Sequence, residues 1–269
     1  MKLFPTIAKA WNAFVRQKKL LPLIVLIDIL FVYGMTRLSA EVLSRAQEYV
    51  MKLTIMTTQQ VQEIAESEAV QASLVQSQEF LTLYHQLLKY VVLFFAGAFV
   101  VWTVGKGLTW YLAHRTVEKK VPARVFALKF LGMTAFWFAA FVLLTFVALS
   151  LFDYVLFGVF PLIGKASANA LVILLYWILA YFVFISYALV PHKAFKQTFV
   201  LGVLRWKELL PVHIVGSLIF FVATTVPASI VKLSVPLSFA FIIFLALPSI
   251  AFARVLWSTA VHEVVKHAS

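Results

Sequence analysis

The chain alternates between long apolar runs and short basic segments, with one extended polar stretch after the first run. Six runs are long enough to cross a bilayer as helices, since about 20 apolar residues span the hydrocarbon core. They cover residues 20–37, 90–113, 125–152, 168–191, 209–231 and 235–258. None alternates with a period of two, which argues against a membrane β-barrel. The pattern predicts an all-α, polytopic membrane protein with six transmembrane helices, the last five forming one continuous membrane region over residues 90–269.

Composition supports this class of protein. The chain is 63% hydrophobic, whereas soluble domains are about 45–50% apolar. The net charge of +12 does not indicate nucleic-acid binding, because the basic residues lie in short segments between apolar runs, where charge sets membrane orientation. The absence of cysteine excludes disulfides, a thiolate nucleophile and cysteine-based metal sites.

The distribution of basic residues predicts the orientation. If the N-terminus is cytoplasmic, 17 of the 23 basic residues lie on the inner side. The outer side then carries six, namely Arg37, Arg45, Lys52, Lys89, Lys165 and Lys232. This bias favours cytoplasmic N- and C-termini in a cell membrane. We also expect the inner segments to contact anionic lipid headgroups.

Residues 1–19 have the pattern of an amphipathic helix that lies in the membrane interface. Apolar side chains fall on one helical stripe, namely Leu3, Phe4, Ile7, Ala8, Trp11, Phe14 and Val15. Lys9 and Arg16 fall elsewhere on the helix. A solvated basic tail is the alternative. The following run, 20–37, is interpreted as the first span rather than a signal peptide, because it contains Asp28 and no small-residue cleavage site follows closely.

Residues 38–89 form the polar stretch and favour helix throughout, with no Gly or Pro. Since both ends join membrane spans, we expect an extracytoplasmic helical hairpin. Its midpoint predicts a tip near residue 64, beside Glu63, Glu66 and Glu68. The alternative is a break in the β-branched segment 54–58, which would give three shorter helices.

Two apolar stripes on this hairpin are candidates for binding a protein partner or a second copy through residues 42–86. The candidate residues are Tyr49, Leu53, Met56, Leu74, Leu81 and Tyr84. An inert helical spacer packed on itself is the alternative interpretation.

Asp28 is the most informative single residue. It lies eight residues after Leu20, about 12 Å into the first span at 1.5 Å per residue and thus near the membrane midplane. A central Asp costs about 2.5–3.5 kcal/mol on an insertion scale, so its carboxylate should face protein or water. Lys106 and Arg254 are the possible partners. The three residues are candidates for a substrate or proton site; a paired or protonated Asp that only fixes helix packing is the alternative.

The remaining motifs do not indicate an enzyme. The sequence HEVVKH at 262–267 separates its histidines by five positions, whereas a zincin helix needs four. Phosphate-binding loops and nucleophile elbows are absent. We therefore expect no catalytic residues, no metal and no cofactor.

One internal similarity precedes two of the spans. Residues 16–22 and 205–211 both read Arg-x-Lys-x-Leu-Leu-Pro, and residues 119–129 supply a looser copy. Three repeated hairpins, each entered by a basic segment, are one explanation; common membrane-edge chemistry is the other.

Two functions remain open. The first is a small permease-like or transport-associated protein with a polar midplane site. The second is a non-catalytic scaffold or sensor that binds partners through the predicted hairpin of residues 38–89, here called the arm.

Overall fold

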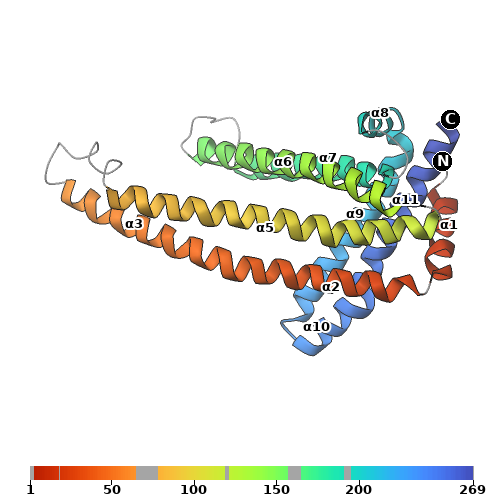
Figure 1. Cartoon of the computed structure of the whole chain (residues 1–269), viewed down its shortest axis with the longest axis horizontal. Coiled ribbons are helices and arrows are strands. Elements are labelled where there is room, and N and C mark those ends of the chain that lie inside the picture. The colour runs from red at the N-terminus through yellow and green to blue at the C-terminus, as the bar shows by residue number, and fades with distance from the viewer. Residues whose placement is uncertain are drawn as a thin grey trace. The chain divides into compact units, whose positions relative to one another are not determined.

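The computed structural model describes residues 3–17, 19–64, 78–118, 121–156, 165–190 and 195–268, and within these ranges every element is helical (Figure 1). The elements are α1 (Leu3–Arg16), α2 (Leu20–Leu38), η1 (Ser39–Leu43), α3 (Ser44–Ile64), α5 (Gln78–Val117), α6 (Ala123–Leu156), α7 (Lys165–Leu189), α8 (Lys196–Leu204), α9 (Trp206–Ile230), α10 (Val235–Phe241), η2 (Ile242–Ala246) and α11 (Leu247–Ala268). The two η elements are π-helical turns inside longer helices.

Six helices in the described part of the chain are long and apolar enough to cross a membrane. They are the continuous helix that begins with α2, then α5, α6, α7 and α9, and the continuous helix from α10 to α11. A helix satisfies every backbone hydrogen bond within its own segment, which the hydrocarbon core requires. The protein is therefore a multi-pass α-helical membrane protein, as its apolar pattern predicts.

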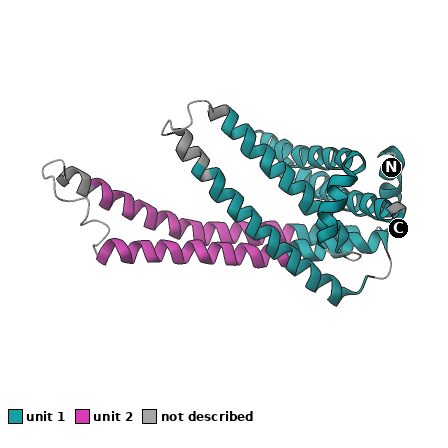
Figure 2. Ribbon diagram, turned by 90° about the horizontal axis from the view of Figure 1, so that it is seen from above, with its two compact units in different colours: residues 1–28, 105–269 teal, residues 29–104 magenta. Residues whose placement is uncertain are grey.

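The chain folds into two compact units (Figure 2). The first, here called the core unit, comprises residues 1–28 and 105–269. The second, the helix-pair unit, comprises residues 29–104. The boundaries fall inside α2 and α5, so each of these helices contributes one part to each unit.

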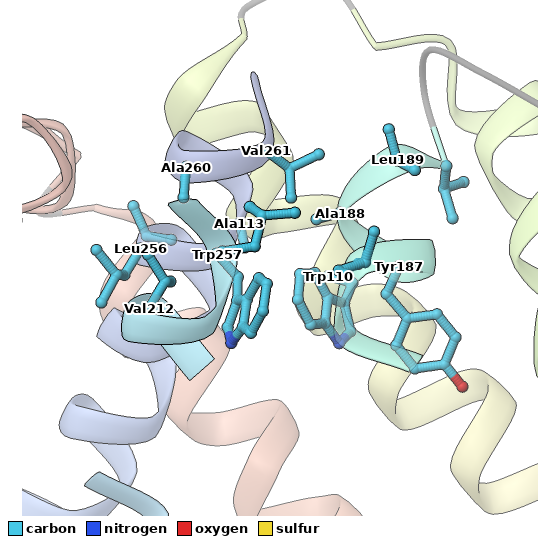
Figure 3. Packing of buried hydrophobic residues seen from close by; sticks show 14 of the residues in the cluster. Trp110, Ala113, Tyr187, Ala188, Leu189, Val212, Leu256, Trp257, Ala260 and Val261 are labelled. Carbon is cyan, nitrogen blue, oxygen red and sulfur yellow. The ribbon is translucent and has the colours of Figure 1, made fainter. Parts of the chain in front are cut away.

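The core unit is held together by a dense aromatic cluster. Phe184 of α7 stacks on Trp257 of α11, with ring centroids 5.8 Å apart, and lies 6.2 Å from Trp110 of α5. Trp110 also meets Tyr187 edge to face at 5.7 Å. Figure 3 shows the rings of Trp110, Trp257 and Tyr187 in this cluster, beside small and β-branched residues such as Ala113 and Val261. Large rings packed against small residues allow the helix backbones to approach closely, as in membrane bundles generally.

Polar side chains also link the helices of this core. His114 Nε2 on α5 forms a 2.9 Å hydrogen bond with the backbone carbonyl of Tyr187 on α7. On α6, Trp137 Nε1 donates to Ser186 Oγ at 2.7 Å, and Thr134 Oγ1 donates to the Tyr187 hydroxyl at 3.3 Å. Polar groups inside apolar helices need such partners because lipid offers none.

The last two apolar runs leave only residues 232–234 between them, and the chain reverses its direction there. The amides of Leu233 and Ser234 both donate to the Ile230 carbonyl, at 2.9 Å each. The Ser234 side chain then caps α10 by accepting the Leu237 amide at 3.4 Å. Pro236 stands in the first turn of α10, where its missing N–H leaves no hydrogen bond unmade.

The short helix α8 was not predicted. It precedes α9 much as α1 precedes α2, so the two closest copies of the internal similarity both follow a short helix. Tyr181 of α7 donates to the Gly202 carbonyl of α8 at 2.9 Å. A Cβ at Gly202 would come within 2.6 Å of the Phe182 ring, so glycine is required for this close approach. Whether the similarity reflects a repeat stays open.

The helix-pair unit consists of two antiparallel helical segments. Phe31 meets Trp102 edge to face at 5.7 Å, and farther along Tyr49 stacks on Tyr90 at 5.6 Å. Between these contacts Gly97 faces Leu38, whose side chain occupies the space a Cβ would need. The π-turn η1 lies in the same region and changes the helical phase before α3 begins.

The alternative break at residues 54–58 is wrong, because α3 is helical through to Ile64. The threonine hydroxyls bond back to carbonyls one turn earlier: Thr54 to Val50 at 2.9 Å, Thr57 to Leu53 at 2.6 Å and Thr58 to Thr54 at 2.8 Å. These bonds satisfy the hydroxyls within the helix and offset the low helix propensity of a threonine run. The predicted acidic tip at Glu66 and Glu68 lies outside the described residues.

Candidate functional site

Three charged side chains meet inside the core unit. Asp28 comes from α2, Lys106 from α5 and Arg254 from α11. They are separated in sequence by 78 and 226 residues from Asp28, so only the packing of the three helices brings them together. These are the residues that the sequence singles out as site candidates, and we call them the charge cluster.

In the charge cluster the Asp28 carboxylate accepts two hydrogen bonds from Arg254 and one from Lys106. Arg254 donates from Nη1 to Asp28 Oδ2 at 2.7 Å and from Nη2 to Oδ1 at 2.8 Å. Lys106 Nζ donates to the same Oδ1 at 3.2 Å. The bidentate pair is the stronger contact, because two parallel charge-assisted bonds fix both groups. Lys106 forms the longer contact.

The residue that forms the stronger contact with Asp28 is also the more deeply buried one. Asp28 and Arg254 are 1% and 3% exposed, while the Lys106 side chain is 17% exposed. The arginine pair is therefore enclosed by protein, and the lysine lies at the edge of the cluster. Lys106 is thus the least enclosed member of the cluster.

The helix around Lys106 is shaped for close packing. A Cβ at the neighbouring Gly107 would stand 3.2 Å from the ring of Phe130 on α6, so the missing side chain lets α6 approach. One turn later the buried Thr109 donates to the Lys106 carbonyl at 3.0 Å. Beside the cluster Ile24 of α2, Leu112 of α5 and Ala251 of α11 pack together. This packing joins the three helices that carry the charges.

The arm candidates divide into two groups. Tyr49, Leu53 and Met56 on α3 are half-buried, and Tyr49 stacks on Tyr90 of the partner helix. Leu81 and Tyr84 on α5 are exposed. Leu74 lies outside the described residues. The first stripe therefore packs within the helix pair, whereas the second leaves apolar side chains uncovered.

A second buried polar group was missed at the sequence level, because isolated histidines in apolar spans give no pattern. His213 of α9 is buried, and its Nε2 lies 3.2 Å from the Trp177 carbonyl. Its Nδ1 has no hydrogen-bond partner, and neither has Trp257 Nε1 nearby, whose ring centroid is 5.7 Å from that of His213. Among the described residues no group of three metal-ligating side chains is present.

Comparison with known proteins finds no family model, no curated protein and no solved structure that matches this chain. The charge cluster and the surfaces of the helices are therefore the observations from which function is inferred.

Proposed function

We propose that the protein is a small permease-like or transport-associated membrane protein whose polar site is the charge cluster of Asp28, Lys106 and Arg254. The observation that carries the proposal is the convergence of three ionisable side chains from three apolar helices. Ionisable residues inside membrane helices are costly, and they commonly mark substrate, ion or proton pathways.

Stability alone does not account for such a cluster. Replacing a buried ion pair with well-packed apolar residues is often neutral, or stabilising by about 1–4 kcal/mol. An apolar triple replacement would serve a purely structural role about equally well. The charges therefore favour a function that needs them, and a proton-linked role is the one their chemistry suits.

In this role Asp28 is the switching group. While ionised, its carboxylate holds Arg254 of α11 through two hydrogen bonds and Lys106 of α5 through one. A proton taken up from water by one carboxylate oxygen neutralises Asp28 and weakens all three bonds. Helices α2 and α11 are then free to separate, which gives the two-state element that alternating access requires.

The absence of cysteine makes a direct test possible. A single cysteine at Thr109, next to the cluster, is treated in sealed vesicles with a small water-soluble thiosulfonate reagent. We expect slow but measurable modification, because transport requires that water reach the site. The matched control is a cysteine at Leu108, which is exposed on the bundle surface and so should face lipid. Equal lack of reaction at both positions, at acid and at neutral pH, would show a sealed cluster and exclude transport through it.

Asp28→Asn provides the second arm of this test. The amide cannot carry the switching proton. Because thiosulfonates react with the thiolate, the rate at Thr109→Cys is compared with that of a freely exposed cysteine at the same pH. We expect this relative rate to rise at acid pH when Asp28 is present, and the rise to disappear in Asp28→Asn while expression is kept. An unchanged pH dependence would remove Asp28 from the proposed switch.

The alternative function is a non-catalytic scaffold or sensor that binds another protein through the arm. The uncovered side chains of Leu81 and Tyr84 on α5 favour it. The simplest case to test is a second copy: cysteines at Tyr84 should form disulfide-linked dimers under mild oxidation, whereas cysteines at Leu53, which is half-buried, should not. Monomers at both positions would count against self-association.

A further inference from the structure

Helix α1 divides its surface into three sectors. The side chains that pack against the core unit are Leu3, Thr6, Ile7, Ala10, Ala13 and Phe14. The polar residues Lys9, Asn12 and Arg16 form a second, exposed sector. The third sector is apolar yet uncovered, with Phe4 83%, Trp11 54% and Val15 38% exposed, and Ala8 exposed between them. At 100° per residue these last four positions fall within about 60° of one another.

This division refines the single stripe that the sequence predicts. Three of its seven members, Leu3, Ile7 and Phe14, are half-buried against the protein, and the other four are exposed. Of these four, Trp11 still touches the ring of Phe252. An uncovered row of large apolar side chains on a helix is unusual in water and marks a surface that meets another apolar phase.

The orientation of α1 is fixed by contacts with α11. Thr6 donates to Glu263 Oε2 at 2.7 Å, and Lys9 forms an ion pair with Glu263 Oε1 at 2.5 Å. At the other end of α1, Trp11 and Phe14 both meet Phe252 edge to face at 5.7 Å. These contacts orient α1 against α11 in a way that leaves its apolar row exposed.

The position of α1 is that of a membrane edge. Its last residue, Arg16, precedes the start of α2 at Leu20, and Asp28 lies eight residues farther along. That distance is about 12 Å along the helix axis, close to half of a hydrocarbon core about 30 Å thick. In Figure 1 α1 lies beside the end of α11, next to both marked chain termini.

Cations stand next to the apolar row. Arg16 and Lys19 are exposed and, with Val15 and Gln17, line an open cavity of about 450 Å³ where α1 turns into α2. Apolar side chains beside two cations match a phospholipid, which presents acyl chains and a phosphate within one molecule.

We propose that this face of α1 is a docking surface for anionic phospholipid. The acyl region lies against Phe4, Ala8, Trp11 and Val15, and the phosphate lies against Arg16 and Lys19. The proposal is independent of the function assigned to the charge cluster, because it concerns different residues and no transport step. It also gives Trp11 the amphipathic position that tryptophan favours at membrane interfaces.

The test uses the whole 269-residue, cysteine-free chain in vesicles. An NBD fluorophore is attached to Ala8→Cys and quenched by lipids that carry a nitroxide on the acyl chain, supplied either as phosphatidylglycerol or as phosphatidylcholine. We expect strong quenching by both lipids, with phosphatidylglycerol preferred. The matched control, Asn12→Cys in the polar sector, should be quenched much less. Equal quenching at Ala8 and Asn12 would overturn the docking surface.

The cations are tested separately. Arg16→Gln and Lys19→Gln should each lower the preference for phosphatidylglycerol by up to about fivefold, and raised salt should lower it in the unsubstituted protein. Because both side chains are exposed, neither substitution should alter the elution profile of the purified protein. A preference that survives the double substitution would overturn the anionic part of the proposal, and quenching equal for the two lipids would do the same.

Discussion

Replacing only one partner of the Asp28–Arg254 pair should lower the unfolding free energy, because the pair is buried. In Asp28→Leu the guanidinium of Arg254, 3% exposed, loses both charge-assisted hydrogen bonds and stays in a low-dielectric site. Removing one partner of a buried pair typically costs about 3–5 kcal/mol. The discount for solvent screening that applies to surface pairs is small here, since both partners are almost fully enclosed. We therefore expect Asp28→Leu to lose about 3–5 kcal/mol of unfolding free energy.

The apolar triple variant is the matched comparison. Asp28→Leu combined with Lys106→Met and Arg254→Met removes every charge of the cluster, so no buried charge is left unpaired. Its stability should return to within about 1–2 kcal/mol of the unsubstituted protein, or exceed it. The assay is reversible unfolding by SDS in mixed micelles, followed by circular dichroism. A cost below about 1 kcal/mol for Asp28→Leu would refute the enclosed ion pair, and a triple variant as unstable as the single one would refute the reasoning about unpaired charge.

The same triple variant separates packing from function. If the cluster only fixes the helices, a stable triple variant should keep the pH-dependent exposure of Thr109→Cys. If the cluster is the proton-linked site, the variant should fold normally and lose that exposure. Stability and accessibility are measured on the same protein, so the two outcomes are distinct.

Three further results are expected. Gly202→Ala should lower the unfolding free energy by about 1–3 kcal/mol, because the new Cβ would stand 2.6 Å from the Phe182 ring. Its control is Gly132→Ala, which has open space around it and should be neutral or stabilising by about 0.4–1 kcal/mol. Thermal unfolding of the two variants in parallel measures the difference. Trp137→Phe removes the 2.7 Å bond to Ser186 and should cost about 0.6 kcal/mol and at most about 1.7, as measured by SDS unfolding; a larger loss would mean that packing rather than the hydrogen bond dominates there. Membrane-impermeant thiol reagents should label a cysteine in the arm of intact cells but not one near either terminus, and the reverse pattern would overturn the predicted orientation.

The apolar pattern determined the six spans and the reversal at 232–234. The reason is physical: a bilayer core accepts only backbone that satisfies its own hydrogen bonds, so each long apolar run has one available structure. The pattern also singled out Asp28, because a carboxylate among leucines and isoleucines needs a partner wherever the helix lies. Lys106 and Arg254 could be named as its partners, because both have long side chains and lie at a similar depth in their predicted spans.

Which face of each helix is covered was decided only by the tertiary structure. Periodicity shows that Leu3, Phe4, Ile7 and Trp11 share a stripe, but not that Leu3 and Ile7 are half-buried against protein while Phe4 and Trp11 stay largely exposed. In water the apolar face of a helix must be the buried one. In a membrane, lipid and protein are equally apolar, so hydrophobicity no longer distinguishes a packed face from an exposed one. The shape of the side chains and a few polar contacts then decide which face packs on protein. Glu263 provides such a contact for α1, and Arg254 provides one for α2.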